Sequence, residues 1–160
     1  MKRSLVAAAA SAAALASIIG WEQYSGTAYM PTPQDRPTLG FGSTTRADGR
    51  PVRPGDKTDP VRAVQKAAAD ADATARAIGS CIGPVPLYQR EWDSFVGLAY
   101  NIGPQAFCGS TLVRLRHQTP PDYTGACKQI LRWDKQAGRT LAGLTRRRQA
   151  EYRQCMGDAP

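Results

Sequence analysis

The chain changes character at Thr58-Asp59-Pro60. On the N-terminal side of this point, residues 21–54 are rich in turn-forming residues and contain one strand-like run. On the C-terminal side, apolar residues recur at helical spacing almost to the end of the chain. This division predicts an α+β fold in which a small β-hairpin lobe is joined to a larger, mainly helical lobe. The cleft between two such lobes is a suitable place for an extended ligand.

The predicted β lobe depends on a short hairpin. Residues 38–45 suit a strand, Ala47-Asp48-Gly49 supplies the residues that reverse the chain, and residues 50–52 would return as the second strand. This turn already explains Asp48, which is therefore a poor candidate for a chemical role.

The helical lobe has clear start and stop signals. Asp59-Pro60 offers a cap followed by a proline at the first helical position, and Gly79 would end that helix. A second helix, with an apolar face that includes Trp92 and Phe95, should end at Gly103-Pro104. Three more helices are expected. The first runs from Ser110 to His117, and the second begins at Asp122 and has Ala126, Ile130 and Trp133 on one face. The third is a basic helix that ends near Cys155 and follows a linker bracketed by Gly138 and Gly143.

Size and charge limit the function only broadly. A chain of 160 residues has room for one domain with a real core, and its net charge of +8 favours an anionic partner such as nucleic acid, a membrane face or the bacterial cell wall. Basic residues gather late in the sequence, above all at Arg146-Arg147-Arg148. Two interpretations stay open for this cluster, a solvated helix face and a binding patch.

Four cysteines are widely spaced and include no Cys-x-x-Cys pair, and His117 is the single histidine. A zinc site is therefore not expected, and neither another metal nor a cofactor is predicted. An even number of cysteines behind an apolar N-terminus is typical of disulfides formed in an oxidising compartment. Three pairings are possible for Cys81, Cys108, Cys127 and Cys155.

The N-terminus looks like an export segment. Met1-Lys2-Arg3 is basic, and residues 4–21 carry no charge and are dominated by alanine. Ala14-Leu15-Ala16 would permit a peptidase to cut after Ala16. Alternatively, the segment stays uncut and holds the protein weakly at the membrane. We therefore divide the chain into an N-terminal signal-anchor, residues 1–20, and a main domain, residues 21–160.

The segment that follows the export signal contains the chemistry. Glu22, Asp35 and Thr38 lie close in sequence, and two carboxylates beside a hydroxyl are what cleavage of a glycosidic bond requires. Trp21 and Tyr24 would give Glu22 the apolar surroundings of a general acid.

This segment resembles the active-site stretch of phage-type lysozymes, the endolysins of glycoside hydrolase family 24. The resemblance rests on Glu22, on Tyr29 seven residues later, and on Thr38-Leu39-Gly40-Phe41-Gly42. Later matches follow in the family's order over nearly all of residues 20–157: Ala99-Tyr100-Asn101-Ile102-Gly103, Arg132-Trp133, and Gly143-Leu144-Thr145-Arg146-Arg147-Arg148 with Glu151.

The resemblance implies a muramidase that hydrolyses the β-1,4 bond between N-acetylmuramic acid and N-acetylglucosamine in peptidoglycan and so lyses the host cell. Glu22 would be the general acid, and Thr38 would help to hold a water molecule that Asp35 activates for inverting attack. The family's aspartate position, nine residues after the glutamate, is Pro31 here, so Asp35 takes the role by elimination. A purely structural Asp35 in a turn before Arg36-Pro37 remains the alternative.

Further expectations come from the same resemblance. Tyr29, Tyr100 and Asn101 would bind substrate, and the disulfides would join Cys81 to Cys108 and Cys127 to Cys155. Many endolysins have an uncut, alanine-rich signal-arrest-release segment that later leaves the membrane and forms the first helix of the domain. The protein would then be held at the periplasmic side of the host inner membrane before its release to the periplasm. Its expected partners are the glycan strands, the inner membrane transiently and the export machinery, with no nucleic acid and with a monomeric state.

Two alternative functions stay open at this point. One is a secreted basic protein that binds nucleic acid or an anionic wall polymer through the Arg-rich C-terminal helix. The other is a lysozyme-like protein that has lost catalysis, which Pro31 and Gln23 (where glycine is usual in the family) would fit. Glu22 distinguishes the muramidase from both alternatives, because catalysis needs the proton of Glu22 and neither binding role does.

Overall fold

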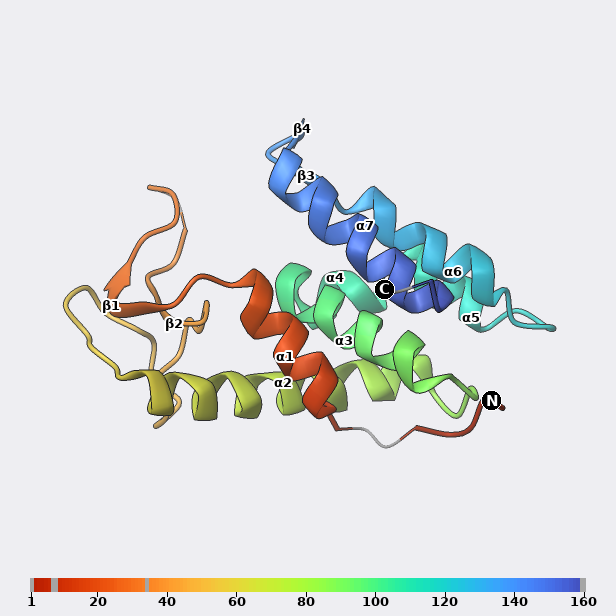
Figure 1. The fold of residues 1–160 in the computed structure, drawn as a ribbon, viewed down its shortest axis with the longest axis horizontal. Helices are drawn as coiled ribbons and strands as arrows, with labels where there is room; N and C mark the ends of the chain where they lie inside the picture. The colour runs from red at the N-terminus through yellow and green to blue at the C-terminus, as the bar shows by residue number, and fades with distance from the viewer. Residues whose placement is uncertain (1, 7–8, 34, 159–160) are drawn as a thin grey trace.

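The computed structural model describes residues 2–6, 9–33 and 35–158. A small lobe with strands β1 (Ser25–Tyr29) and β2 (Thr38–Gly40) lies at one end, and a larger group of helices lies at the other (Figure 1). The long helix α2 (Pro60–Ile82) runs beneath both and connects them (Figure 1). The predicted α+β class is confirmed.

Helix α2 begins where the sequence predicts. Asp59 caps it by accepting a hydrogen bond from the Arg62 backbone N–H at 2.9 Å, and Pro60 takes the first helical position. The end expected at Gly79 is wrong: the helix continues to Ile82, and Gly83 ends it with φ of 69°. The buried face of α2 is mostly alanine, which lets neighbouring helices approach closely: Ala63, Ala67, Ala71, Ala75, Ile78 and Ile82.

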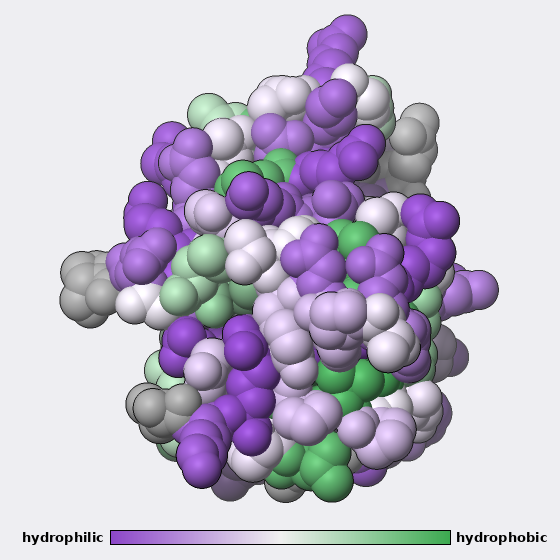
Figure 2. Space-filling model, turned by 90° about the vertical axis from the view of Figure 1, so that its right-hand side faces the viewer, coloured by the Kyte–Doolittle hydropathy of each residue, from purple (hydrophilic) through white to green (hydrophobic). Residues whose placement is uncertain are grey.

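The other helices pack around α3 (Gln89–Ile102), which is buried along most of its length. They are the short α4 (Pro104–Cys108), α5 (Thr111–Arg116), α6 (Tyr123–Gln129) with the 3-10 turn η1 (Ile130–Arg132), and α7 (Ala142–Met156). Trp92 and Phe95 of α3 lie at the centre of the main core with Phe107 and Leu112. Figure 2 looks onto this helical end, where hydrophilic side chains cover most of the surface between separate hydrophobic patches.

Helix α1 (Ala12–Trp21) is formed by residues that the sequence assigned mainly to a signal-anchor. Ser11 caps it by accepting a hydrogen bond from the Ala14 backbone N–H at 3.0 Å. Ala14 and Ile18 are fully buried in the main core, where α1 packs against α2 and α3. The packed domain therefore begins before residue 20. None of the helices among the described residues combines the length and the apolar character needed to cross a membrane.

The β lobe differs from its prediction. The strand expected over residues 38–45 ends at Gly40, because Gly40 and Gly42 adopt positive φ angles of 66° and 80° that bend the chain out of an extended path. Its partner is β1 in an antiparallel pair, and β1 was not predicted. The turn at Asp48-Gly49 is present, but residues 50–52 contribute only an isolated bridge at Pro51 rather than a strand.

Between η1 and α7, a second hairpin is formed by β3 (Lys135–Gln136) and β4 (Arg139–Thr140). Only β4 falls within the linker expected between Gly138 and Gly143, and α7 begins at Ala142. Disulfides join Cys81 of α2 to Cys108 of α4 and Cys127 of α6 to Cys155 of α7. These are the two pairs that the family resemblance favoured. The second disulfide fixes the last helix to the lobe.

Candidate active site

Glu22 follows the last residue of α1, and its backbone N–H still donates to the Ile18 carbonyl at 3.0 Å. Its side chain is 22% exposed, so the carboxylate is partly sheltered but accessible. Oε1 accepts a hydrogen bond from Nη1 of Arg147 at 2.6 Å. Oε2 faces the backbone of Gly42, where a β-carbon would lie only 3.3 Å from it. A residue larger than glycine would crowd the carboxylate there.

Arg147 belongs to a buried charge network on α7. Its Nε donates to Oε1 of Glu151 at 3.0 Å, and Arg148 pairs with the other Glu151 oxygen and with Oδ1 of Asn101. Burial raises the pKa of Glu151 above its ordinary value, against the opposing effect of the two arginines. The network links the candidate acid to the helical lobe through Glu22, Arg147, Glu151, Arg148 and Asn101.

The solvated-face interpretation of the arginine cluster is wrong for two of its members. Arg147 and Arg148 are 5% and 0% exposed, whereas Arg146 is exposed. Buried guanidinium groups cannot serve as a surface patch for nucleic acid. Sequence reasoning missed their role in the site, and the available signal was the spacing of both arginines from Glu151, which is one helical turn away.

Thr38 and Tyr29 face each other across the β1–β2 pair. The Thr38 hydroxyl donates to the Tyr29 carbonyl at 3.4 Å, and Thr38 is buried. The Tyr29 ring is 41% exposed and therefore available to a ligand on the β lobe. The structure brings these two predicted residues together within one sheet.

Asp35 lies in the loop between β1 and β2 and is exposed. Its backbone N–H donates to the Thr32 carbonyl at 3.0 Å. Within the described residues, no hydrogen bond or ion pair joins the Asp35 carboxylate to Glu22 or Thr38. The structure thus places Asp35 on the part of the β lobe that precedes Thr38.

A pocket of about 500 Å³ is lined by Gly42, the residue whose backbone faces the Glu22 carboxylate. Its lining combines the chain around Gly42, the middle of α2 and the end of α3, including two predicted substrate-binding residues, Tyr100 and Asn101. The Tyr100 hydroxyl donates to the Phe41 carbonyl at 3.0 Å. Burial, followed by the negative charges of Asp70 and Glu22, raises the pKa of Tyr100 above its ordinary value, so the phenol stays neutral.

Asp70 is an acidic residue in the lining of this pocket that sequence reasoning did not identify. Its carboxylate accepts a hydrogen bond from the Ser43 hydroxyl at 2.7 Å and pairs with Lys66 one turn earlier on α2. With both oxygens engaged, Asp70 fixes the chain near Gly42 to α2. No sequence motif links Asp70 to Ser43, since the contact depends on the fold.

The remaining polar candidates have structural roles. His117 caps the end of α5, with Nε2 lying 2.8 Å from the Cys81 carbonyl oxygen. Over residues 2–6, 9–33 and 35–158, no group of three or more histidine, cysteine, aspartate or glutamate side chains is arranged to hold a metal ion.

A helical fold with a small β lobe, and a glutamate at the end of the first helix beside a cleft, define the class as lysozyme-like glycoside hydrolases. Residues 20–151 match the family model described as phage lysozyme, and the chain belongs to this family. The endolysin of Salmonella phage P22 is 35% identical over 115 residues, which are 72% of this chain and 76% of that protein. The SAR-endolysin of Bacteriophage PS34 is 29% identical over 119 residues, 74% of this chain and 67% of that protein.

Solved structures agree with this assignment. The endolysin from Escherichia coli O157:H7 phage FAHEc1 superposes with a TM-score of 0.79 at 29% identity, and the alignment covers 99% of each chain.

Proposed function

We propose that this protein is an endolysin muramidase that hydrolyses the β-1,4 bond between N-acetylmuramic acid and N-acetylglucosamine in peptidoglycan and thereby lyses the host cell. The observation that carries the proposal is Glu22, held between Arg147 and Gly42, and Gly42 lines the pocket. Relatives named as endolysins support the same activity. The basic-binding-protein alternative loses its support because Arg147 and Arg148 are buried.

In the proposed mechanism, Glu22 gives its proton to the glycosidic oxygen as the bond to the anomeric carbon breaks. A water molecule attacks that carbon from the opposite face of the sugar, and the configuration inverts. Asp35 accepts the proton of this water, and Thr38 helps to hold it. An inverting pair needs its carboxyl groups about 6.5–9.5 Å apart, which leaves room for the water.

Asp35 is exposed on the chain between β1 and β2, so it is accessible to substrate in the cleft. Thr38 is already fixed at the start of β2. We therefore expect binding of the glycan to complete the acid and base pair, with Tyr29, Tyr100 and Asn101 as substrate contacts.

The N-terminal segment is proposed to leave the membrane uncut, so the protein passes from the host inner membrane to the periplasm. Relatives named as SAR-endolysins support this route. The packing of α1 supports it as well, because Ala14-Leu15-Ala16 lies inside the helix that ends at Trp21, directly before Glu22. Cutting after Ala16 would remove the first half of the helix that positions the proposed acid.

The test compares the wild type with Glu22→Gln, which keeps the shape of the side chain and removes its acid. Chloroform-treated Gram-negative cell walls are followed by turbidity, and the products are assayed for new reducing ends. We expect clearing and new reducing ends from the wild type only. Clearing by both proteins would exclude Glu22 as the acid, and sedimentation of both with uncleared walls would make the protein a wall-binding relative without catalysis.

A matched pair then examines the second carboxylate. Asp35→Asn should reduce the rate of wall clearing by at least about 10²-fold, the scale of a lost general base. Asp48→Asn, on the turn of the same lobe, should leave the rate unchanged. Equal activity of Asp35→Asn and the wild type would leave Asp35 with the structural role of a turn residue.

A further inference from the structure

Arg3, close to the N-terminus, lies on the helical lobe in a slot formed by Tyr88, Glu91 and Tyr123, far from the candidate active site. Its guanidinium carbon lies 4.3 Å from the centre of the Tyr88 ring and 3.5 Å from the centre of the Tyr123 ring. Nη2 and Nε donate to the carboxylate of Glu91 at 2.7 and 3.2 Å. A planar cation is thus stacked between two aromatic faces and bound at its edge by a carboxylate.

The slot is built for a guanidinium group. Glu91 is 2% exposed, and its Oε2 also accepts the Tyr88 backbone N–H at 2.8 Å, which caps α3. Arg3 is the partner that forms an ion pair with Glu91 among the described residues. Without Arg3, the buried carboxylate would lose its ion-pair partner, which is unfavourable. A lysine could supply the charge but neither the flat stacking surface nor two donors in one plane.

Two more arginines lie against the same rings. Arg116 lies 3.9 Å from the centre of the Tyr123 ring, and Arg90 lies 4.1 Å from the centre of the Tyr88 ring. The charge of Glu91 acts on Arg116, but neither arginine forms an ion pair with Glu91 in the described part of the chain. Arg3 is therefore the cation that the Glu91 carboxylate binds directly there.

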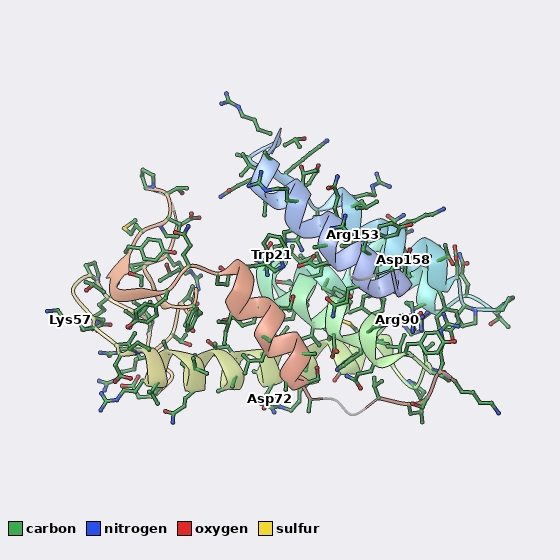
Figure 3. All side chains as sticks on the ribbon, in the orientation of Figure 1. Trp21, Lys57, Asp72, Arg90, Arg153 and Asp158 are labelled. Carbon is green, nitrogen blue, oxygen red and sulfur yellow. A yellow bond between two sulfur atoms is a disulfide. The ribbon has the colours of Figure 1, made fainter. Side chains whose placement is uncertain are left out.

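Other residues between Arg3 and the start of α1, which we call the N-terminal strap, also contact the helical lobe. Ser4 and Leu87 exchange two backbone hydrogen bonds, at 3.0 and 2.8 Å. Further along, the Trp92 indole N–H donates to the Ala9 carbonyl at 2.9 Å, and the Ala10 N–H donates to Asp72 at the same distance. Figure 3 shows Asp72 on α2 near the start of α1, and it shows Arg90 at the opposite end of the N-terminal strap, near the C-terminal helices.

We propose that Tyr88, Glu91 and Tyr123 form a binding site for the protein's own Arg3 guanidinium, and that its occupation commits the N-terminal segment to the folded domain. The membrane consequence rests on the proposed function, in which this segment first lies in the bilayer. When the segment spans the membrane, Arg3 and Glu91 lie on opposite sides of it. Arg3 can therefore bind to Tyr88, Glu91 and Tyr123 only after the segment has left the membrane, and this binding opposes return of the segment to the lipid.

The first experiment uses the purified full-length protein and amide hydrogen exchange at Ser4 and Leu87, whose N–H groups join the strap to the lobe. We expect Arg3→Gln to accelerate exchange at both amides by at least about tenfold, the size of a local opening made easier by one lost charged contact. Lys2→Gln, which removes the adjacent charge, should leave both amides protected. Equal protection in Arg3→Gln and the wild type would overturn the proposal.

The second experiment leaves the N-terminal charges intact and changes the other side of the slot. Tyr123→Leu should accelerate exchange at the same amides, and in cells it should leave a larger share of protein in the membrane fraction after the membrane potential is collapsed. An unchanged Tyr123→Leu exchange rate would contradict the stacking role. If the wild type never enters the membrane fraction, or if its N-terminus is Ser17, the membrane proposal fails, while exchange in the full-length protein still decides whether the slot binds Arg3.

Discussion

At the scale of single residues, Glu22 depends on groups that are distant in sequence. Arg147 is 125 positions away and supplies the hydrogen bond that orients one carboxylate oxygen, and Gly42 leaves room for the other. The sequence motif pointed to Glu22 as the proposed acid through Tyr29, seven residues later, and through the glycine-rich strand that follows, although the spacing from Glu22 to Thr38 is one residue longer than the common family pattern. Arg147 could not be found in the same way, since a run of three arginines has the composition of a solvated surface whether or not two of them are buried.

Arg147→Gln should lower both activity and stability. Removal of one partner from a buried charged network leaves Glu151 with only Arg148 and leaves Glu22 unoriented, so we expect a loss of about 3 kcal/mol in the free energy of unfolding. A displaced acid should also reduce the rate of wall clearing by about 10²-fold. Urea unfolding and the turbidity assay measure the two effects. Exposed Arg146→Gln is the matched control and should stay within about 0.5 kcal/mol of the wild type.

Tyr100→Phe should change how stability depends on alkaline pH. The pKa of Tyr100 is raised in the folded state, so folding is favoured while the phenol is neutral, and this contribution is lost as the pH rises from the unfolded value of about 10 through the folded value. The wild type should therefore lose stability more steeply than Tyr100→Phe above about pH 10. Urea midpoints for both proteins across this range measure the difference, and parallel curves would contradict it.

At the scale of elements, prediction succeeded where a local signal decides the structure. Asp59, Ser110 and Asp122 each cap the helix that the sequence placed after them, because a cap needs only its own next turn. It failed for β1 and for the length of β2, where pairing partners and two positive-φ glycines decide the outcome. The position of α1 also depends on context, since an alanine-rich apolar segment suits both lipid and a protein core.

Ile18→Ala tests whether α1 positions Glu22. Ile18 is buried in the main core, one turn before the proposed acid, and the cavity should cost about 3 kcal/mol in the free energy of unfolding. Loosening of α1 should also reduce the rate of wall clearing at temperatures where the variant is still folded. Leu5→Ala, at a side chain that is 66% exposed, should alter neither quantity. A destabilised Ile18→Ala with full activity would show that Glu22 is held without α1.

At the scale of the whole molecule, the site is made where the two lobes meet. Glu22 leaves the end of α1, Gly42 and Thr38 belong to the β lobe, and Arg147 comes from the last helix. The sequence could predict two lobes with a cleft, because the change from turn-rich to helical pattern is abrupt at Pro60. That residues before position 20 form the first helix of the domain was expected only from the family resemblance, because composition alone does not decide whether an alanine-rich segment packs in lipid or in a protein core.

A shortened protein that begins at Ser17 should separate the two proposed fates of the N-terminus. It would lack Arg3, the Ser11 cap and the buried Ala14, so the remainder of α1 would be too short to form a stable helix by itself. We expect a lower unfolding midpoint and at least about 10-fold slower wall clearing than the full-length protein, because the acid loses its support. If the shortened protein clears walls as fast as the full chain, α1 is dispensable and cleavage after Ala16 is compatible with function. The N-terminal mass of the protein recovered after lysis then decides between release of the uncut chain and cleavage after Ala16. We expect an intact N-terminus, because α1 is packed against α2 and α3 on both sides of the Ala16–Ser17 bond.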